Sequence, residues 1–235
     1  MAEESLARTV RWYDRIAPVY DLVCGPLYAK PRRYALERMQ LQGGERVLEI
    51  GCGTGLNLPG MAEAVGPQGR VAGWDASWNM LERAHRRVEA LGLEQVILHE
   101  EDFLNPPRAA LKGILMKQLG TAHPDVILCS YLFAIAPSWR QTFTRAFELL
   151  PPGGYLITVD TQPFQGGWRW LNPLAVPIAN WSGHGDLRRP TREWCTRLPL
   201  TDLRQFYGGG VYVTRTRKLG RKRWSEGPPI SPIDL

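Results

Sequence analysis

The stretch RVLEIGCGTGLNL, residues 46–58, constrains the fold more than any other part of this 235-residue sequence. Its first five residues are compatible with a buried strand, and Gly51, Gly53 and Gly55 follow at alternating positions. Glycine tolerates positive φ and has no Cβ, so the backbone here can turn sharply and approach a ligand closely. The stretch therefore predicts a ligand-binding turn between a strand and a helix.

Strand-like and helix-like segments alternate along the following hundred or so residues, and residues 78–93 form the clearest amphipathic helix. Such alternation predicts an α/β fold with a Rossmann-like, mostly parallel sheet that helices cover on both faces. Residues 202–219 are predicted to close the sheet as an antiparallel hairpin. Four predicted parallel strands lie at residues 46–50, 70–77, 95–102 and 125–132, and residues 149–160 are predicted to be a turn that leads into the fifth.

Two segments stand outside this alternation. Residues 4–40 are predicted to be helical, with breaks at Pro18 and around Cys24-Gly25-Pro26. Residues 161–200, dense in Trp, Gly and Pro, are predicted to be an inserted region of helix and loop. The length predicts a single domain over residues 1–222, followed by a disordered tail at 223–235.

Acidic residues indicate which ligand the glycine turn binds. A dinucleotide fingerprint requires G-x-G-x-x-G, but the spacing here is G-x-G-x-G, and Leu56 occupies the third position. Asp75 ends the second strand, where a carboxylate can accept both hydrogen bonds from a ribose diol. Glu49 is unfavourable beside a pyrophosphate but favourable beside a positively charged amino group. With Asp102 at the third strand, the set favours S-adenosylmethionine (SAM) over a dinucleotide.

With these residues, the sequence resembles the class I SAM-dependent methyltransferases over about residues 10–160 and the closing hairpin. VLEIGCGTG resembles the first motif of the family, GWDASWNMLERA its second-strand motif, EEDF its adenine-facing segment and LLPPGGYLITVD the turn before its fifth strand. The resemblance implies an enzyme with SAM as its cofactor, a seven-stranded sheet and an N-terminal helical lid. It implies cofactor contacts from Glu49, Gly51, Cys52 and Gly53 at the methionine side, Asp75 and Ala76 at the ribose, Trp78 or Met80 beside the adenine, Asp102 and Phe103 at the adenine, and Ser130 beneath the sulfonium.

The segment RWYDRIAPVYDLVCGPLY, residues 11–28, contains two Tyr-Asp pairs. It resembles the N-terminal lid of two groups with lipophilic substrates: the quinone-biosynthesis C-methyltransferases, and the phospholipid N-methyltransferases with the related betaine-lipid enzymes. By this resemblance Tyr13 and Tyr20 are candidate catalytic residues and Tyr28 is a candidate substrate contact. The alternative is that these tyrosines serve only in packing.

The inserted region supplies further candidates. Arg188 and Arg189, close to several Trp residues, could bind a phosphodiester head group at a bilayer interface, where Trp and Arg are favoured. His184 and Asp186, each beside a glycine, are candidate catalytic residues that could reach into a pocket. The basic run RKLGRKRW, residues 217–224, could bind an anionic membrane surface, or it could be a solvated terminus.

Composition limits the other possibilities. The formal net charge of +6 favours anionic partners. The four cysteines are widely spaced, which predicts neither a metal site nor a disulfide framework but a reduced, cytoplasmic setting. The sequence shows no signal peptide and no apolar run long enough to span a bilayer. The protein is thus predicted to be cytoplasmic, and peripheral binding to the inner membrane face is left open.

The preferred interpretation is a SAM-dependent methyltransferase that N-methylates a membrane phospholipid amine of the phosphatidylethanolamine type, or a betaine-lipid head group. Its expected partners are a lipid or other amphipathic substrate and an anionic membrane surface. The alternatives are a quinone-ring C-methyltransferase and a soluble small-molecule N- or O-methyltransferase. A SAM sensor or an RNA-binding relative is the third class, but CSYLFA after the fourth strand lacks the N/D-P-P-Y/F motif, so nucleic acid is not an expected partner. The oligomeric state is left open.

Overall fold

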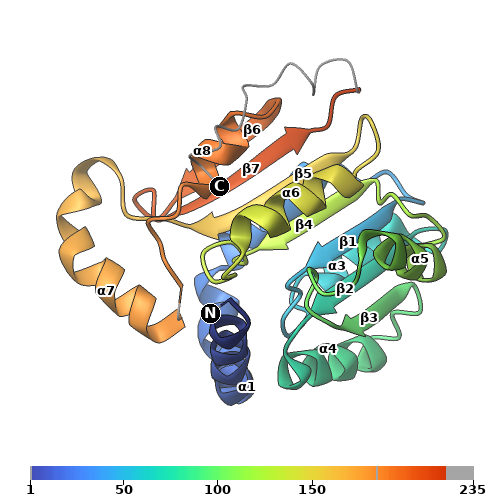
Figure 1. Ribbon diagram of the computed structural model, residues 1–235, viewed down its shortest axis with the longest axis horizontal. Helices are drawn as coiled ribbons and strands as arrows, with labels where there is room; N and C mark the ends of the chain where they lie inside the picture. The colour runs from blue at the N-terminus through green and yellow to red at the C-terminus, as the bar shows by residue number, and fades with distance from the viewer. Residues whose placement is uncertain (1, 184, 221–235) are drawn as a thin grey trace.

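A computed structural model of the chain describes residues 2–183 and 185–220. In it one sheet of seven strands has the order β3-β2-β1-β4-β5-β7-β6 (Figure 1). The first five strands run parallel, and β7 pairs antiparallel with both β5 and β6. The predicted sheet with its C-terminal hairpin is thereby confirmed. The strands are β1 (Arg46–Ile50), β2 (Arg70–Asp75), β3 (Val96–Glu100), β4 (Val126–Ser130), β5 (Tyr155–Thr161), β6 (Leu200–Phe206) and β7 (Val211–Arg217).

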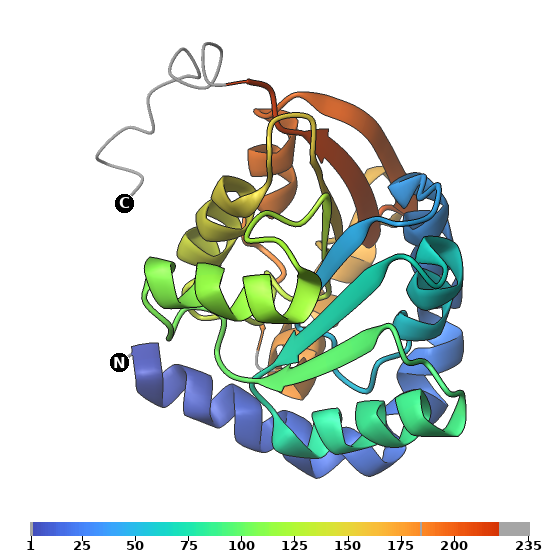
Figure 2. The ribbon, with the colours of Figure 1, turned by 90° about the vertical axis from the view of Figure 1, so that its right-hand side faces the viewer.

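Helices cover both faces of the sheet, as Figure 2 shows for α2 and α3 on one side and α5 and α6 on the other. Alternate residues of β1 divide between the two cores: Val47 packs with α2 and α3, and Leu48 packs with α5 and α6. The helices are α1 (Ala2–Leu27), α2 (Ala29–Met39), α3 (Leu58–Val65), α4 (Trp78–Ala90), α5 (Arg108–Leu119), α6 (Trp139–Leu149), the 3₁₀ helix η1 (Gly166–Leu171), α7 (Asn172–Gly183) and α8 (Thr191–Thr196).

The first helix corrects one expectation, because α1 continues through Pro18 and Pro26. Proline has no N–H, so Pro18 leaves the carbonyl of Asp14 without its helical partner. The Nδ2 of Asn79 donates to that carbonyl at 3.3 Å. At the end of α1, Arg32 donates to the carbonyls of Cys24 and Gly25. Asn79 thus satisfies the carbonyl that Pro18 leaves free, Arg32 binds carbonyls of the last helical turn, and the break falls at Tyr28.

The inserted region is helical and extends from the main body. It contains η1, α7 and α8, and α7 lies beside α1 at the end of the molecule toward which the carboxyl ends of β1 and β4 point (Figure 1). The segment before β4 contains the packed helix α5, whose Leu111, Leu115 and Leu119 are buried. No helix in the described residues combines the length and apolarity needed to cross a bilayer. His184 and the predicted tail lie outside the described residues.

Candidate active site

A cavity of about 430 Å³ lies at the carboxyl ends of β1, β2 and β4. The chain connections reverse direction between β1 and β4, and such a switch point opens a crevice that parallel α/β sheets use for ligands. We call this cavity the cofactor pocket. Of the residues predicted to bind a cofactor or to catalyse, the following line it: Tyr13, Tyr20, Gly51, Gly53, Asp75, Ala76, Met80, Asp102, Phe103 and Ser130.

The glycine turn forms one wall because its backbone adopts conformations that other residues avoid. Gly51, Gly53 and Gly55 have φ values of 74°, 54° and 74°. A Cβ on Gly55 would lie 2.7 Å from the Leu58 side chain, so this glycine lets the turn pack onto α3. A Cβ on Gly53 would meet nothing within 4 Å. Gly53 therefore presents bare backbone to the open side of the turn.

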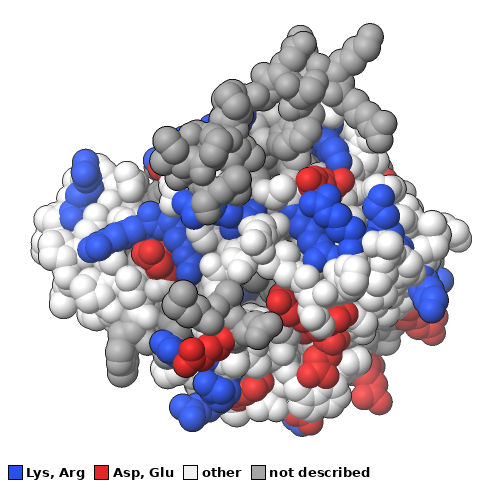
Figure 3. Space-filling model, viewed as in Figure 1, with Lys and Arg blue, Asp and Glu red and all other residues white. Residues whose placement is uncertain are grey.

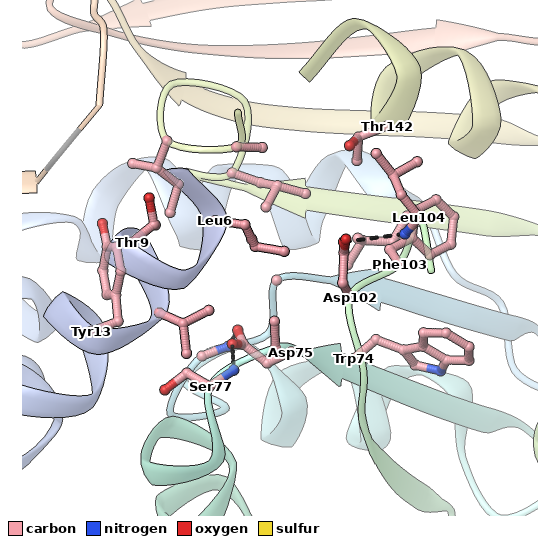
Figure 4. A pocket seen from close by; sticks show the side chains of 18 of the residues that line it. Leu6, Thr9, Tyr13, Trp74, Asp75, Ser77, Asp102, Phe103, Leu104 and Thr142 are labelled. Carbon is pink, nitrogen blue, oxygen red and sulfur yellow. Dashed lines mark hydrogen bonds between the residues drawn. The ribbon is translucent and has the colours of Figure 1, made fainter. Parts of the chain in front are cut away.

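Two carboxylates point into the cavity from the ends of neighbouring strands (Figure 4). Asp75, at the end of β2, accepts backbone N–H bonds from Gly53 at 2.8 Å and from Ser77 at 2.9 Å, one on each oxygen. Asp102, after β3, accepts the N–H of Leu104 at 3.2 Å. The two N–H bonds hold the Asp75 carboxylate in place. Because each carboxylate oxygen has two lone pairs, Asp75 can still accept hydrogen bonds from two hydroxyl groups. This geometry suits the ribose diol of SAM.

Three predicted cofactor residues lie outside the wall. Trp78 is exposed on α4, and Cys52 is buried against Gly73. Glu49 is buried behind Ser130, where its Oε1 accepts bonds from Asn57 at 2.6 Å and Ser130 at 3.2 Å. Its Oε2 is buried without a hydrogen-bond partner. Burial raises the pKa of Glu49 to about 8, although the two donors oppose the shift.

The first helix forms the wall opposite the carboxylates, where Leu6, Thr9 and Tyr13 face the cavity (Figure 4). Asp14 and Asp21 hold the helix there. Asp14 accepts the hydroxyl of Ser77 at 2.6 Å. Asp21 accepts the hydroxyl of Thr54 at 2.5 Å and forms an ion pair with Arg87 at 2.7 Å. We call these five residues the α1 latch: Asp14, Asp21, Thr54, Ser77 and Arg87.

The aspartates of the two Tyr-Asp pairs were not among the candidate site residues in the sequence, whereas the tyrosines were. The pairs are seven residues apart, or about two helical turns, so like residues lie on one face of the helix. The tyrosines face the cavity and the aspartates face the glycine turn and α4. The spacing of seven was the signal that could have identified the latch.

A second cavity, of about 380 Å³, adjoins the first. Tyr13, Tyr20, Tyr131 and Ile135 line both cavities, so a group bound in one can reach the other. The walls of the second come from α1, the loop after β4, the segment after β5, α7 and the β6–β7 turn. Among the described residues, no side chain with a formal charge lines it. We call this cavity the aromatic pocket; its aromatic residues are Trp12, Tyr13, Tyr20, Tyr28, Tyr131, Phe164 and Tyr207.

Tyr131 stands at the junction of the two cavities and was missed in the sequence. It follows β4 directly and has a φ of 55°, a left-handed conformation that is uncommon for residues other than glycine. Its ring lies 4.2 Å from that of Tyr28, and its hydroxyl is buried without a hydrogen-bond partner. A strained residue with an unpaired hydroxyl at a strand end is typical of a functional site.

The turn between β6 and β7 completes the aromatic pocket through three successive glycines. A Cβ on Gly208 would lie 2.6 Å from Trp168, one on Gly209 would lie 2.7 Å from Gln165, and one on Gly210 would lie 2.8 Å from Phe164. Only glycine lets the segment after β5 pack this closely onto the turn. The glycines of the sequence YGGGV are therefore required for this wall of the pocket to form.

The charged candidates of the inserted region do not line either cavity. Arg189 donates to the carbonyls of Phe133 at 2.6 Å and Ala136, and Arg188 is exposed. Asp186 donates its backbone N–H to Ala134 at 2.7 Å and accepts the N–H of Arg188. These residues fasten the loop after α7 to the loop after β4. Tyr28, in contrast, lies in the wall of the aromatic pocket.

Burial keeps the hydroxyl groups of this region protonated. It raises the pKa of Tyr28 to about 12 and raises the pKa of Tyr13, Tyr20 and Tyr131 well above the ordinary value. Behind the pocket wall, burial also raises the pKa of Asp160 to about 7. At neutral pH the tyrosines are therefore neutral and can donate hydrogen bonds, but they are poor proton acceptors.

Comparison with known proteins agrees with this geometry. A family model described as a methyltransferase domain matches residues 41–194. Demethylmenaquinone methyltransferase from Listeria welshimeri is 28% identical over 223 residues, covering 88% of this chain and 90% of the relative. The protein of that name from Geobacillus stearothermophilus is 27% identical over 176 residues, covering 73% of this chain and 70% of the relative.

A solved structure has the same fold. An O-methyltransferase family protein from Burkholderia thailandensis superposes with a TM-score of 0.67 at 17% identity, covering 88% of this chain and 60% of that one. The match of the family model spans well over half of the chain and includes the glycine turn, Asp75 and Asp102. The chain therefore belongs to the methyltransferase-domain family, and it is a class I, SAM-dependent methyltransferase.

Proposed function

We propose that this enzyme methylates a ring carbon of a quinol, the reduced form of a quinone, which enters the aromatic pocket. The observation that carries the proposal is the pocket itself: it is lined by aromatic and other uncharged side chains among the described residues, and it opens into the cofactor pocket at Tyr13, Tyr20 and Tyr131. The names of the relatives from Listeria and Geobacillus support a quinone-type substrate.

The preferred interpretation from sequence, a phospholipid amine, receives less support. A zwitterionic head group needs a cation for its phosphate and an acceptor for its ammonium, because burying unpaired charges is costly. Arg189 is engaged with backbone carbonyls and Asp186 with the adjoining loop. Arg188 does not line the pocket. We therefore prefer the quinol, which is neutral and planar.

The chemistry requires little covalent participation by the protein. SAM supplies an electrophilic methyl group on a sulfonium. The new bond joins the ring carbon to the methyl carbon as the carbon–sulfur bond breaks, and the ring then loses a proton, which we expect to leave to solvent. Only the reduced ring has the electron density for this attack. The protein contributes by aligning the two reactants in adjoining pockets, which can supply much of the rate enhancement.

The tyrosines are assigned a positioning role. Protonated Tyr20 and Tyr131 can donate hydrogen bonds to the oxygens of the quinol and so fix the face of the ring that meets the methyl group. The unpaired hydroxyl of Tyr131 supports this assignment.

In the test, purified protein and methyl-labelled SAM are incubated separately with three substrates: chemically reduced demethylmenaquinone, the same compound oxidised, and phosphatidylethanolamine vesicles. We expect label in the reduced quinone and in neither of the others. Label in phosphatidylethanolamine would restore the phospholipid interpretation. A parallel incubation contains a water-soluble metabolite extract. Label in that extract but in neither lipid would contradict the quinol and phospholipid interpretations and favour a soluble substrate.

A further inference from the structure

The outer surface of α1 carries large apolar side chains that contact nothing in the described part of the protein strongly enough to bury them. Val19, Leu22, Val23 and Leu27 are each more than half exposed, and Leu22 is 79% exposed. They lie on the same stretch of helix as Tyr20 and Cys24, which line the aromatic pocket. One face of this stretch of α1 therefore lines the aromatic pocket, and another face is exposed on the surface of the protein.

A second exposed apolar set lies on the inserted region. Trp168 and Trp170 of η1 and Leu174 and Ile178 of α7 are all more than half exposed, and Trp170 is 74% exposed. Again the pocket-lining residues alternate with them, since Ala175, Val176 and Ala179 face inward. Exposure of two tryptophans is unusual on a surface that contacts only water.

The two sets meet at the mouth of the aromatic pocket. Tyr207 donates its hydroxyl to the carbonyl of Leu27 at 2.9 Å, and the adjacent Gly208 packs against Trp168. Leu27 and Tyr207 both line the pocket and are about half exposed, so the pocket opens here. We call this surface the apolar rim; its residues are Val19, Leu22, Val23, Leu27, Trp168, Trp170, Leu174, Ile178 and Tyr207.

Exposed basic residues lie close in sequence to the apolar rim. They are Arg11 and Arg15 of α1, Lys30 of α2 and Arg169 of η1. The acidic residues of α1 between Arg11 and Lys30 are the two aspartates of the latch, which face the glycine turn and α4. The sequence has no acidic residue from 161 to 185. Figure 3 shows the α7 end as mostly uncharged surface, with basic residues and some acidic surface near its margin.

We propose that the apolar rim inserts into the surface of an anionic lipid bilayer. Exposed Trp and Leu flanked by Arg and Lys complement the interface of such a bilayer, where aromatic rings lie at head-group level and basic residues meet anionic head groups. A second copy of this chain fits less well, because symmetric packing would bring these basic residues against one another. The rim then delivers a membrane-dissolved substrate directly into the aromatic pocket. The identity of that substrate rests on the proposed function, whereas bilayer binding does not.

The test compares the full-length protein with the double variant Leu22→Ser/Trp170→Ser in flotation with vesicles. The vesicles are phosphatidylcholine alone, or phosphatidylcholine mixed with phosphatidylglycerol. The matched control is Met116→Ser, because Met116 is also more than half exposed but lies on α5, at the other end of the molecule (Figure 1). We expect the wild type and the control to bind the anionic vesicles, and the double variant to bind at least about tenfold more weakly.

Two further readouts separate this inference from other outcomes. If the double variant binds vesicles as the wild type does, the rim is not the bilayer surface. If the wild type sediments as a dimer that the double variant loses, and neither binds vesicles, a second copy covers the rim and the proposal is overturned. Methylation of a short-chain, water-soluble quinol should be unchanged in the double variant. Failure of that reaction in the wild type contradicts the proposed function and leaves the vesicle result to stand alone.

Discussion

The two pockets of this enzyme are built by different means. The cofactor pocket is formed largely by strand ends and the backbone of one glycine turn, and its polar groups are fixed by backbone hydrogen bonds, as the two N–H donors to Asp75 illustrate. The aromatic pocket is formed by side chains from five separate segments and has no charged group among the described residues. The cofactor pocket therefore recognises its ligand through polar groups close together in the fold. The aromatic pocket recognises its ligand through uncharged side chains that come from distant parts of the sequence. Changes to single residues can test whether the two are as separate as this contrast implies.

The largest expected effect is in the cofactor pocket. Asp75→Ala removes a carboxylate that we expect to accept two charge-assisted hydrogen bonds, each contributing about 1.5–3 kcal/mol. The affinity for SAM, measured by calorimetry, should fall about 1000-fold, whereas quinol binding to the aromatic pocket should change little. Glu94→Ala, at an exposed position, is the control. A loss of quinol binding equal to the loss of SAM binding would show that the pockets are not separate.

The second expected effect concerns the buried acid of the cofactor side. The folded state raises the pKa of Glu49 to about 8, so it binds a proton more tightly than the unfolded chain does. This contribution to stability is present below about pH 4.5 and is lost as pH rises toward 8. The glutamine of Glu49→Gln does not titrate, so the variant should not lose stability in this way. The difference in free energy of unfolding between variant and wild type should therefore grow by about 4 kcal/mol over that window. Urea denaturation at several pH values would measure it, and a constant difference would contradict the prediction.

A charge placed in the aromatic pocket should act there alone. Ala175→Asp puts a carboxylate in an uncharged wall, and an unpaired buried charge costs several kcal/mol unless it is neutralised. We expect kcat/KM for the quinol to fall about 30-fold, with the Kd for SAM within twofold of the wild type. Ala175→Ser, of similar size but uncharged, should retain most activity. Equal losses in the two variants would mean that shape, and not charge, governs this pocket.

The smallest expected effect lies in the α1 latch, which both pockets share. Asp21→Asn removes a half-buried ion pair with Arg87, for which about 1 kcal/mol is typical. The KM for SAM and for the quinol should each rise about three- to tenfold, and amide exchange in α1 should become faster. Glu82→Gln, which removes an exposed ion pair with Arg86 on α4, is the control. An increase in only one KM would show that α1 serves a single pocket.

The contrast between the pockets also explains what the sequence could predict. Strand period, glycine spacing and acids at strand ends are local patterns, and they predicted the sheet and the pocket-lining positions of Gly51, Gly53, Asp75 and Asp102. The resemblance to class I methyltransferases added four more residues that line the pocket: Ala76, Met80, Phe103 and Ser130. It also implied Glu49, Cys52 and Trp78, but the first two are buried behind the wall and Trp78 is exposed on α4. Tyr131, Phe164 and Tyr207 meet only after chain segments far apart in sequence pack together, so no local pattern could group them. The predicted helix break at Pro18 was wrong because the carbonyl that this proline leaves free is satisfied by Asn79, 61 positions later.

The position of α1 has a thermodynamic consequence. Because the helix forms a wall of both pockets, a ligand that restricts the motion of α1 in one pocket would also order the surface that the other ligand contacts. We expect the two binding events to be linked in this way, and any such coupling changes the affinity of each ligand by the same factor. A substrate arriving from a bilayer would meet its tightest site only in molecules that already hold the methyl donor. Such an order of binding would keep an apolar substrate from occupying the enzyme unproductively.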